Sequence, residues 1–362
     1  MNSELIEKRA HSKERNVLAI VHGTLWRWMA VPTAYVLMVL LMKWPETAAR
    51  AVRAAMQQWY HSVLPALFPF MILMPMITGA EAACIYEKML GQVMNRVFAL
   101  PGCAAPAIVT AMIAGSPAGA IASARIAEQA GMSSGQLLRL AGCVCGMSPA
   151  FLVSGIGAGI LGDVNAGVML LKTQMLSQII MLIATRRYSG GERIQPNGCT
   201  DGASGNAVGA VLSVAGYMAF FNVIAEMISR VSGGGVWNYS ICLLEVTAGA
   251  GYLAGKEISR SIKMIILAGM CGFGGVSICA QNMKILKKYG ISTGGYIKWR
   301  VSAAAISAAV MIAQMWIWNH NTYIIRNKWL ETASLFVILM AVPTIKVLSK
   351  PFLNKKDFED FG

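Results

Sequence analysis

The stretch Gly115-Ser116-Pro117-Ala118-Gly119-Ala120 interrupts an apolar segment that is long enough to enter a lipid bilayer. Proline lacks the N–H of a helical hydrogen bond and the two glycines loosen the turn, so the stretch predicts a broken helix. Broken backbone is tolerated at membrane depth only where protein or a water-filled cavity satisfies the freed N–H and C=O groups. The interruption therefore predicts a binding site or pathway.

The composition is that of a polytopic membrane protein. Apolar residues make up 56% of the 362 residues and charged residues 13%, whereas a soluble domain has about 25% charged residues. The net charge is +14, and the basic residues lie mostly between apolar runs and at both termini. Anionic lipid head groups explain this charge more simply than nucleic acid, because the sequence has no basic stripe with interleaved aromatic residues. We expect a lipid bilayer as partner and no nucleic acid.

We predict an all-α polytopic fold with about eight to ten membrane segments, interrupted or re-entrant ones included, in two related halves. The outermost predicted spans cover residues 25–42 and 330–348. Residues 45–60 are predicted to form an amphipathic interfacial helix, and the three prolines of 63–80 predict kinks or a re-entrant path. The predicted parts are a cytoplasmic tail (1–24), a first membrane half (25–185), a polar linker (186–206), a second membrane half (207–348) and a cytoplasmic tail (349–362).

A second apolar stretch carries Gly272-Phe273-Gly274-Gly275, so the interruption occurs twice. Shifting the chain by 159 positions (274 minus 115) aligns the two stretches without a gap and gives five identities in 25 positions. Gly115 falls on Gly274 and Gly131 on Gly290, which predicts an internal repeat. The flank of the second copy is the more basic one, which favours a cytoplasmic position for it and an outside position for the first flank. The alternative is that both flanks are cytoplasmic.

The candidate binding residues lie at the two interruptions and at polar positions inside apolar runs. They are Ser116, Pro117, Gly119, Asn222, Glu245, Gly274, Gly275 and Gln281. An ionisable Glu245 in the apolar run 236–253 is costly unless it is paired or hydrated, so it is either a substrate or ion ligand or one member of a buried pair with Lys172.

The other candidates also have two interpretations. The small residues at the interruptions can expose backbone groups to a polar or anionic ligand, or they can allow tight helix packing. Asn222 and Gln281 can hydrogen-bond to a ligand or between helices.

The sequence carries no sign of catalytic or metal chemistry. It has no G-x-S-x-G, H-E-x-x-H or Walker motif, and its four histidines share no ligand spacing. Seven of the eight cysteines lie in or beside apolar runs, where cysteine acts as a small apolar filler. We therefore expect no enzyme, no catalytic residue, no cofactor, no metal and no disulfide framework.

Four motifs occur in order over about residues 55–320. They are Leu64-Pro65-Ala66-Leu67-Phe68-Pro69-Phe70, Gly115-Ser116-Pro117-Ala118-Gly119-Ala120, Leu244-Glu245-Val246-Thr247, and Gly272-Phe273-Gly274-Gly275-Val276-Ser277 with Gln281. Together they resemble the family of sporulation integral membrane proteins of the YlbJ type, which carry paired nucleoside-recognition (Gate) domains. The resemblance implies a multipass plasma-membrane protein of endospore-forming bacteria.

Two functions are expected from this resemblance and from the interrupted helices. The first is transport of a small polar solute through a paired-repeat core, and the second is a non-transporting role in assembly of the spore envelope, its cortex or coat. A homo-oligomer or other sporulation membrane proteins are the candidate partners. Basic segments near both ends predict that both termini are cytoplasmic.

Overall fold

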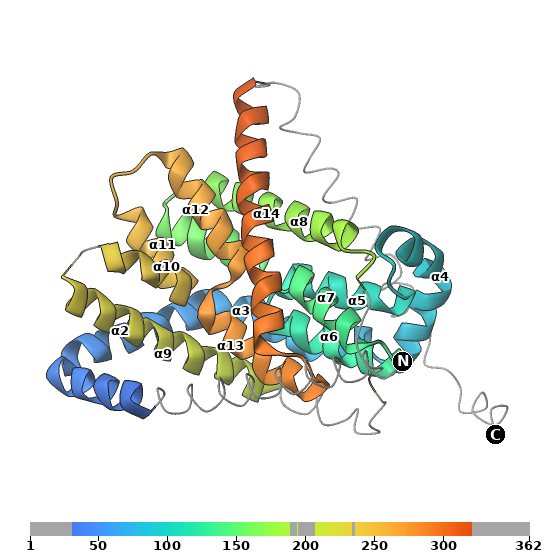
Figure 1. Ribbon diagram of the computed structural model, residues 1–362, viewed down its shortest axis with the longest axis horizontal. Coiled ribbons are helices and arrows are strands. Elements are labelled where there is room, and N and C mark those ends of the chain that lie inside the picture. The colour runs from blue at the N-terminus through green and yellow to red at the C-terminus, as the bar shows by residue number, and fades with distance from the viewer. Residues whose placement is uncertain (1–30, 189–193, 195–206, 234–235, 321–362) are drawn as a thin grey trace, which may run out of the picture.

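The computed structural model describes residues 31–188, 194, 207–233 and 236–320, and every regular element in these ranges is a helix (Figure 1). The predicted tails and the predicted span 330–348 lie outside the described residues, as do most of the predicted linker and the start of the span predicted over 25–42. The helical content agrees with the predicted all-α fold class.

The elements up to residue 184 include the first predicted interruption. A helix over Val31–Lys43 comes first. It is followed by α2 (Pro45–Gln58), the π-helical turn η1 (Trp59–Val63), α3 (Leu64–Ile77), α4 (Ala80–Phe98), η2 (Gly102–Ala104), α5 (Ala105–Ala114), α6 (Ala118–Gln129), α7 (Ser134–Val144), the π-helix η3 (Phe151–Ile160) and α8 (Val164–Ala184).

The elements from residue 207 onward include the second interruption. They are α9 (Ala207–Ser232), η4 (Val236–Ser240), α10 (Ile241–Leu244), α11 (Val246–Ala254), α12 (Arg260–Phe273), α13 (Gly275–Leu286), η5 (Lys287–Tyr289) and α14 (Thr293–His320). The long helix α14, in orange to red, stands upright in Figure 1 and packs against α12, α8 and α7.

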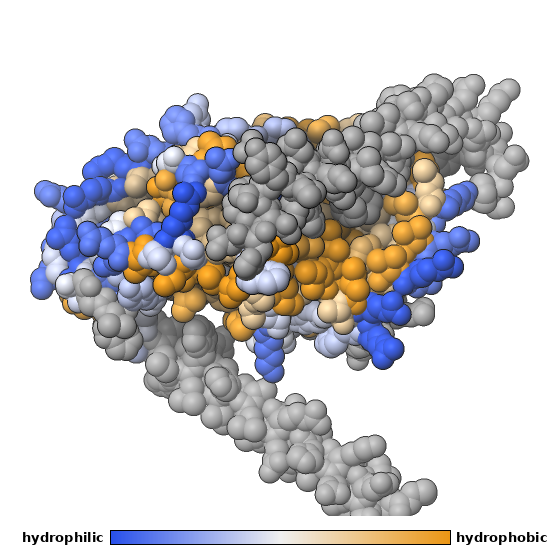
Figure 2. Space-filling view, turned by 90° about the horizontal axis from the view of Figure 1, so that it is seen from above, coloured by the Kyte–Doolittle hydropathy of each residue, from blue (hydrophilic) through white to orange (hydrophobic). Residues whose placement is uncertain are grey.

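Five helices of the described residues are long and apolar enough to cross a membrane, or six if one bent pair counts as a span. The five are Pro45–Ile77, Val164–Ala184, Val208–Ser232, Arg260–Tyr289 and Thr293–Ile317, and the pair is Ala80–Phe98 with Gly102–Ala114, bent by 88°. Figure 2 shows apolar side chains over much of the middle of one face, with hydrophilic side chains gathered towards both ends of the long axis. The protein is therefore an all-α polytopic membrane protein.

The helix predicted over residues 45–60 is present but does not end there. Helix α2 continues through η1 into α3 as one run of 33 residues, Pro45–Ile77. On its apolar side the buried Ala55 of α2 packs with Val211 and Val214 of α9, while Arg50 and Arg53 are exposed. The amphipathic pattern of α2 therefore includes a contact with a neighbouring helix, and an interfacial position stays a prediction.

Helix ends recur at the offset that the sequence predicts for the repeat. Helix α5 ends at Ala114 and α12 ends at Phe273, and α7 begins at Ser134 and α14 at Thr293, so both pairs are 159 residues apart (273 minus 114, 293 minus 134). The repeated segments also share one hydrophobic core, in which Leu140 of α7 is buried in the same cluster as Tyr296 of α14. Equivalent segments are therefore packed together and do not form separate domains.

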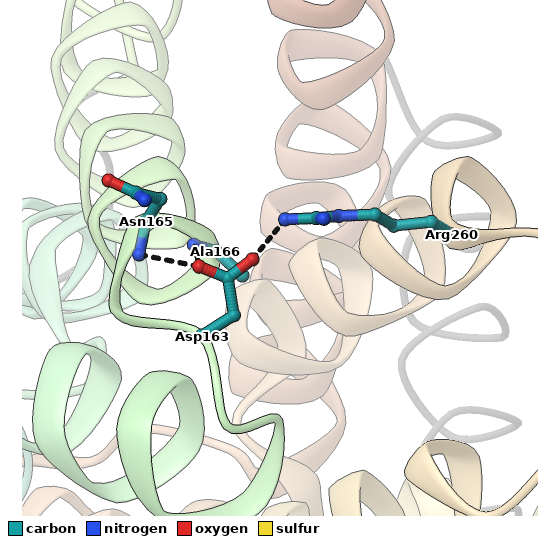
Figure 3. Close-up of polar contacts among 4 residues, drawn as sticks. All are labelled: Asp163, Asn165, Ala166 and Arg260. Atoms are coloured by element: carbon teal, nitrogen blue, oxygen red, sulfur yellow. Dashed lines mark hydrogen bonds and ion pairs between the residues drawn. The ribbon is translucent and has the colours of Figure 1, made fainter.

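An ion pair joins the two halves at the surface. Asp163 caps the N-terminus of α8 by accepting hydrogen bonds from the backbone N–H groups of Asn165 (2.9 Å) and Ala166 (3.3 Å). Its second carboxylate oxygen pairs with Arg260, the first residue of α12 (Figure 3). One side chain thus fixes the start of α8 and contacts the start of α12.

Candidate functional site

The first predicted interruption is present between α5 and α6, at residues 115–117. The backbone N–H of Ser116 donates a 2.8 Å hydrogen bond to the carbonyl of Gly146. A Cβ atom on Gly115 would lie 2.5 Å from the backbone nitrogen of Ser148, so only glycine permits this approach. The interruption is therefore docked directly on a second non-helical segment, residues 145–148, which follows α7.

Two glutamines of α8 satisfy the backbone of this second segment. The side chain of Gln174 accepts a hydrogen bond from the N–H of Met147 (2.9 Å) and donates one to its carbonyl (2.7 Å). The amide of Gln178 donates to the carbonyl of Val144 (2.8 Å). Buried backbone groups that leave a helix need such partners, and here the protein itself supplies them.

The interruption predicted in the second half is present at Gly274, which lies between α12 and α13 with φ of 87°. The buried guanidinium of Arg300 donates hydrogen bonds to the carbonyls of Phe273 (3.1 Å) and Gly272 at the C-terminus of α12. It also donates to the carbonyl of Gly142 in α7 (3.1 Å). Arg300 therefore satisfies the end of the broken helix and ties it to the first half.

Glu245 lies between α10 and α11 at a fourth interruption, in addition to those at residues 115–117, at residues 145–148 and at Gly274. Glu245 has extended backbone and caps α11, because its carboxylate accepts hydrogen bonds from the N–H of Ala248 (2.8 Å) and from the hydroxyl of Thr247. A Cβ on Gly275 would lie 3.0 Å from the carbonyl oxygen of Leu244. The interruption that follows α12 therefore lies directly against the one that carries Glu245.

The four interruptions line one cavity. Its polar lining comes from residues in or shortly after all four, namely Ser116, Ser148, Glu245, Thr247 and Ser277, and from Gln281 further along α13. Its apolar lining includes side chains of η1, α3, η3 and α9, among them Val63, Leu67, Phe151, Val214 and Met218. The cavity has about 540 Å³ of empty space, counting its open side, and the centres of water molecules can occupy about 50 Å³ of it. That is room for roughly three to five waters.

The structure brings part of the predicted residue set to this cavity. Ser116, Glu245 and Gln281 line it, and the amide of Gln281 hydrogen-bonds to Ser277 (3.4 Å). Asn222 donates to the carbonyl of Met218 in its own helix (2.9 Å) and is also close enough to hydrogen-bond with the Glu245 carboxyl.

The remaining predicted residues shape the backbone around the cavity. Pro117 is buried at the N-terminus of α6, and Gly274 and Gly275 form the junction of α12 and α13. Gly119 packs against Ala111 so closely that a Cβ on it would lie 2.5 Å from the Cβ of Ala111. Gly119 therefore allows tight helix packing, which is one of the two interpretations given for the small residues at the interruptions.

The contacts of Glu245 do not include the partner that the sequence suggested. Within the described residues, its carboxyl contacts the side chains of Thr247 and Asn222 and the backbone N–H groups of Thr247 and Ala248, and Lys172 is not among these contacts. All four groups are neutral. The buried-pair alternative is therefore not supported by the described contacts.

Sequence reasoning missed several residues of the site. Thr247 lies two residues after the interruption at Glu245, and Ser277 lies three residues after the interruption at Gly274. A polar residue shortly after a helix break is therefore a sequence signal that could have identified both. The amide of Asn282 donates to the hydroxyls of Ser116 (3.2 Å) and Tyr296 (2.7 Å), linking α13 to the first interruption. Only the folded chain brings these segments together, and the sequence has no signal for that contact.

The fold and site define a class: an all-α polytopic membrane protein in which broken helices from both halves line one cavity. The chain is similar to the protein named "Sporulation integral membrane protein YlbJ" of Bacillus subtilis (strain 168), with 22% identity over 320 residues. The alignment covers 75% of this chain and 78% of the relative. No family model matches the chain, and no solved structure matches it. The relative supports the resemblance to the YlbJ type, and the nucleoside-recognition domains stay a prediction.

Proposed function

We propose that this chain is a multipass plasma-membrane protein of sporulation that moves a small polar solute through its paired-repeat core. The sporulation role is proposed from the name of the similar protein in Bacillus subtilis. The single observation that supports transport is the cavity with a buried carboxylate, Glu245, lined by broken helices from both halves. Discontinuous helices around a midplane site are a recurring transporter architecture.

The geometry suggests how such a core would work. Hydroxyl and amide groups at the broken helix ends supply polar contacts, while side chains from α3, α9 and η3 close the apolar side. Movement of one half against the other would open the cavity to one side of the membrane at a time. Room for roughly three to five waters favours a small solute in this conformation, and a nucleoside would require the cavity to widen.

The alternative is a non-transporting membrane component needed for assembly of the spore envelope, its cortex or coat. The observation that favours it is the dense satisfaction of the interruptions by Gln174, Gln178 and Arg300, which would hold a static core together. Both functions require the same membrane fold. They differ in whether any solute depends on the cavity.

The test compares small polar metabolites in sporulating cells of the organism that encodes the chain. Cells lacking the protein are complemented with the wild type, with Glu245→Gln or with Glu226→Gln, a matched control on an exposed position of α9. Transport predicts that the deletion and Glu245→Gln change the level of the same solute, at normal protein levels, while Glu226→Gln behaves as wild type. An envelope defect with an unchanged metabolite profile would favour the alternative.

A further inference from the structure

The starting observation is a buried carboxylate whose described contacts are neutral. Glu245 is 5% exposed, and its contacts are the hydroxyl and backbone N–H of Thr247, the Ala248 N–H and the Asn222 amide. An ionised carboxylate removed from water is costly unless a positive charge compensates it. The contacts supply hydrogen bonds to the carboxylate but no such charge.

The cavity wall does not supply the charge either. Glu245 is the only charged side chain among the described residues that line the cavity. Arg300 lies near the Gly274 junction, but its guanidinium is already hydrogen-bonded to carbonyls of Gly142, Gly272 and Phe273. Nothing in the lining therefore neutralises Glu245, and the cavity beside it is open to a small cationic ligand.

The remaining polar groups of the wall are of the kind that hard cations prefer. Hydroxyl oxygens come from Ser116, Ser148, Thr247 and Ser277, and an amide oxygen comes from Gln281. Hard cations bind oxygen ligands, and in transporters unwound backbone and half-helix ends at broken helices hold coupling cations such as Na⁺. The set combines one carboxylate with several neutral oxygens.

The single carboxylate of the site favours a monovalent cation over a divalent one. The described residues contain no group of three or more His, Cys, Asp or Glu side chains that could hold a metal ion, whereas protein sites for Ca²⁺ commonly combine several carboxylates. One carboxylate balances one positive charge. Room for roughly three to five waters also suits a cation that keeps part of its hydration shell.

We infer that the cavity binds one monovalent alkali cation, with Glu245 as the charged ligand and hydroxyl and amide oxygens of the four interruptions as neutral ligands. This inference rests on the proposed function, in which the cation would be the transported ion or the ion that drives the solute. The inference specifies a class of ligand, the alkali cations, for the cavity in which transport is proposed.

The test is a thermal-unfolding titration of the purified full chain in detergent. NaCl, KCl and LiCl are each compared with choline chloride at equal ionic strength. A bound cation stabilises the folded state as its concentration rises above the dissociation constant. We expect at least one alkali cation to raise the unfolding midpoint in a saturable way, and choline to leave it unchanged.

Variants assign the effect to the cavity. Glu245→Gln should abolish the cation-dependent rise, while Glu226→Gln, the same change on an exposed position, should keep it. If Glu245→Gln does not fold, Ser277→Ala serves instead, because loss of one neutral ligand should raise the half-saturating concentration several-fold. A rise that is equal in choline, or that persists in Glu245→Gln, overturns the inference. Stabilisation by acidification but by no alkali cation assigns the site to a proton and also overturns it.

The two experiments distinguish failure of the transport proposal from failure of the cation-site proposal. Saturable cation stabilisation without any solute difference in the metabolite comparison keeps the cation site and removes transport of an organic solute. A solute difference without cation stabilisation keeps transport and removes the cation site.

Discussion

Replacing Gly115 by alanine tests whether the first interruption is docked as closely as the structure has it. Gly115 has φ of 72° and ψ of −158°, a region essentially confined to glycine, and another residue there costs about 1–3 kcal/mol. The new Cβ would also lie 2.5 Å from the Ser148 nitrogen and 2.8 Å from the Met147 carbonyl carbon. Overpacking of this kind costs about 1–3 kcal/mol, so Gly115→Ala should lose about 2–6 kcal/mol in all.

Gly131→Ala is the matched control within the same repeat. Gly131 has a similar positive φ of 57°, but a Cβ there meets nothing within 4 Å. Its loss should therefore be limited to the left-handed backbone cost, about 1–2 kcal/mol. The difference between the two variants contains the contact between the interruption and residues 147–148 and the larger backbone cost at Gly115, whose ψ of −158° lies outside the left-handed region.

The assay is the unfolding midpoint of the detergent-solubilised protein at one fixed scan rate, because membrane-protein unfolding is often irreversible. At about 2 °C per kcal/mol for a large chain, Gly115→Ala should lower the midpoint by about 4–12 °C and Gly131→Ala by about 2–4 °C. Equal midpoints for Gly115→Ala and Gly131→Ala would refute the close approach.

Three further predictions concern the ties between the halves and the topology. Arg300→Met should lower the unfolding midpoint by about 4 °C or more, because buried carbonyls lose their donor, and Arg300→Lys should recover part of the loss. Arg260→Ala should shift the midpoint by less than about 2 °C, because an ion pair with an Arg side chain that is 74% exposed is worth little, whereas Asp163→Ala should cost more by removing the cap of α8. In a cysteine-free background, Ser3→Cys and Asn354→Cys should resist a membrane-impermeant maleimide in intact cells and react after permeabilisation. Labelling of either end in intact cells would contradict cytoplasmic termini.

The interruptions at residues 115–117 and at Gly274 were predictable because they depend on local chemistry, whereas the break at Glu245 was not predicted. Proline removes an N–H and glycine permits positive φ, so the breaks at Pro117 and Gly274 follow from residue type alone. The offset of 159 residues could be found in the sequence for the same reason. The glycines that follow the two helix ends, Gly115 and Gly274, stand 159 residues apart. The repeated helix ends at Ala114 and Phe273 are therefore local features seen twice.

The contacts that hold the interruptions were not predictable from one sequence. Gln174 and Gln178 were part of an ordinary apolar span, and only the packing of α8 against the end of α7 turns them into backbone partners. The packing of residues 45–60 against α9 was not predicted, because a membrane surface and a neighbouring helix give the same amphipathic periodicity. Distinguishing them needs the position of α9, which the local pattern does not contain.

The repeat and the charge of the site have different origins in the chain. The aligned segments, residues 115–139 and 274–298, each contain one interruption, and Asn282 of α13 in the second segment donates a hydrogen bond to Ser116 at the first interruption. Glu245 lies outside both copies, and it reaches the cavity because α13 begins against the Leu244 carbonyl. Among the described residues the cavity between these segments is therefore lined by one carboxylate, which neither aligned segment supplies. The broken helices give the cavity its shape, and Glu245, from outside both aligned segments, sets its charge. Because Glu245 also caps α11, a change there affects packing as well as charge, so the cation titration needs the second variant, Ser277→Ala, beside Glu245→Gln.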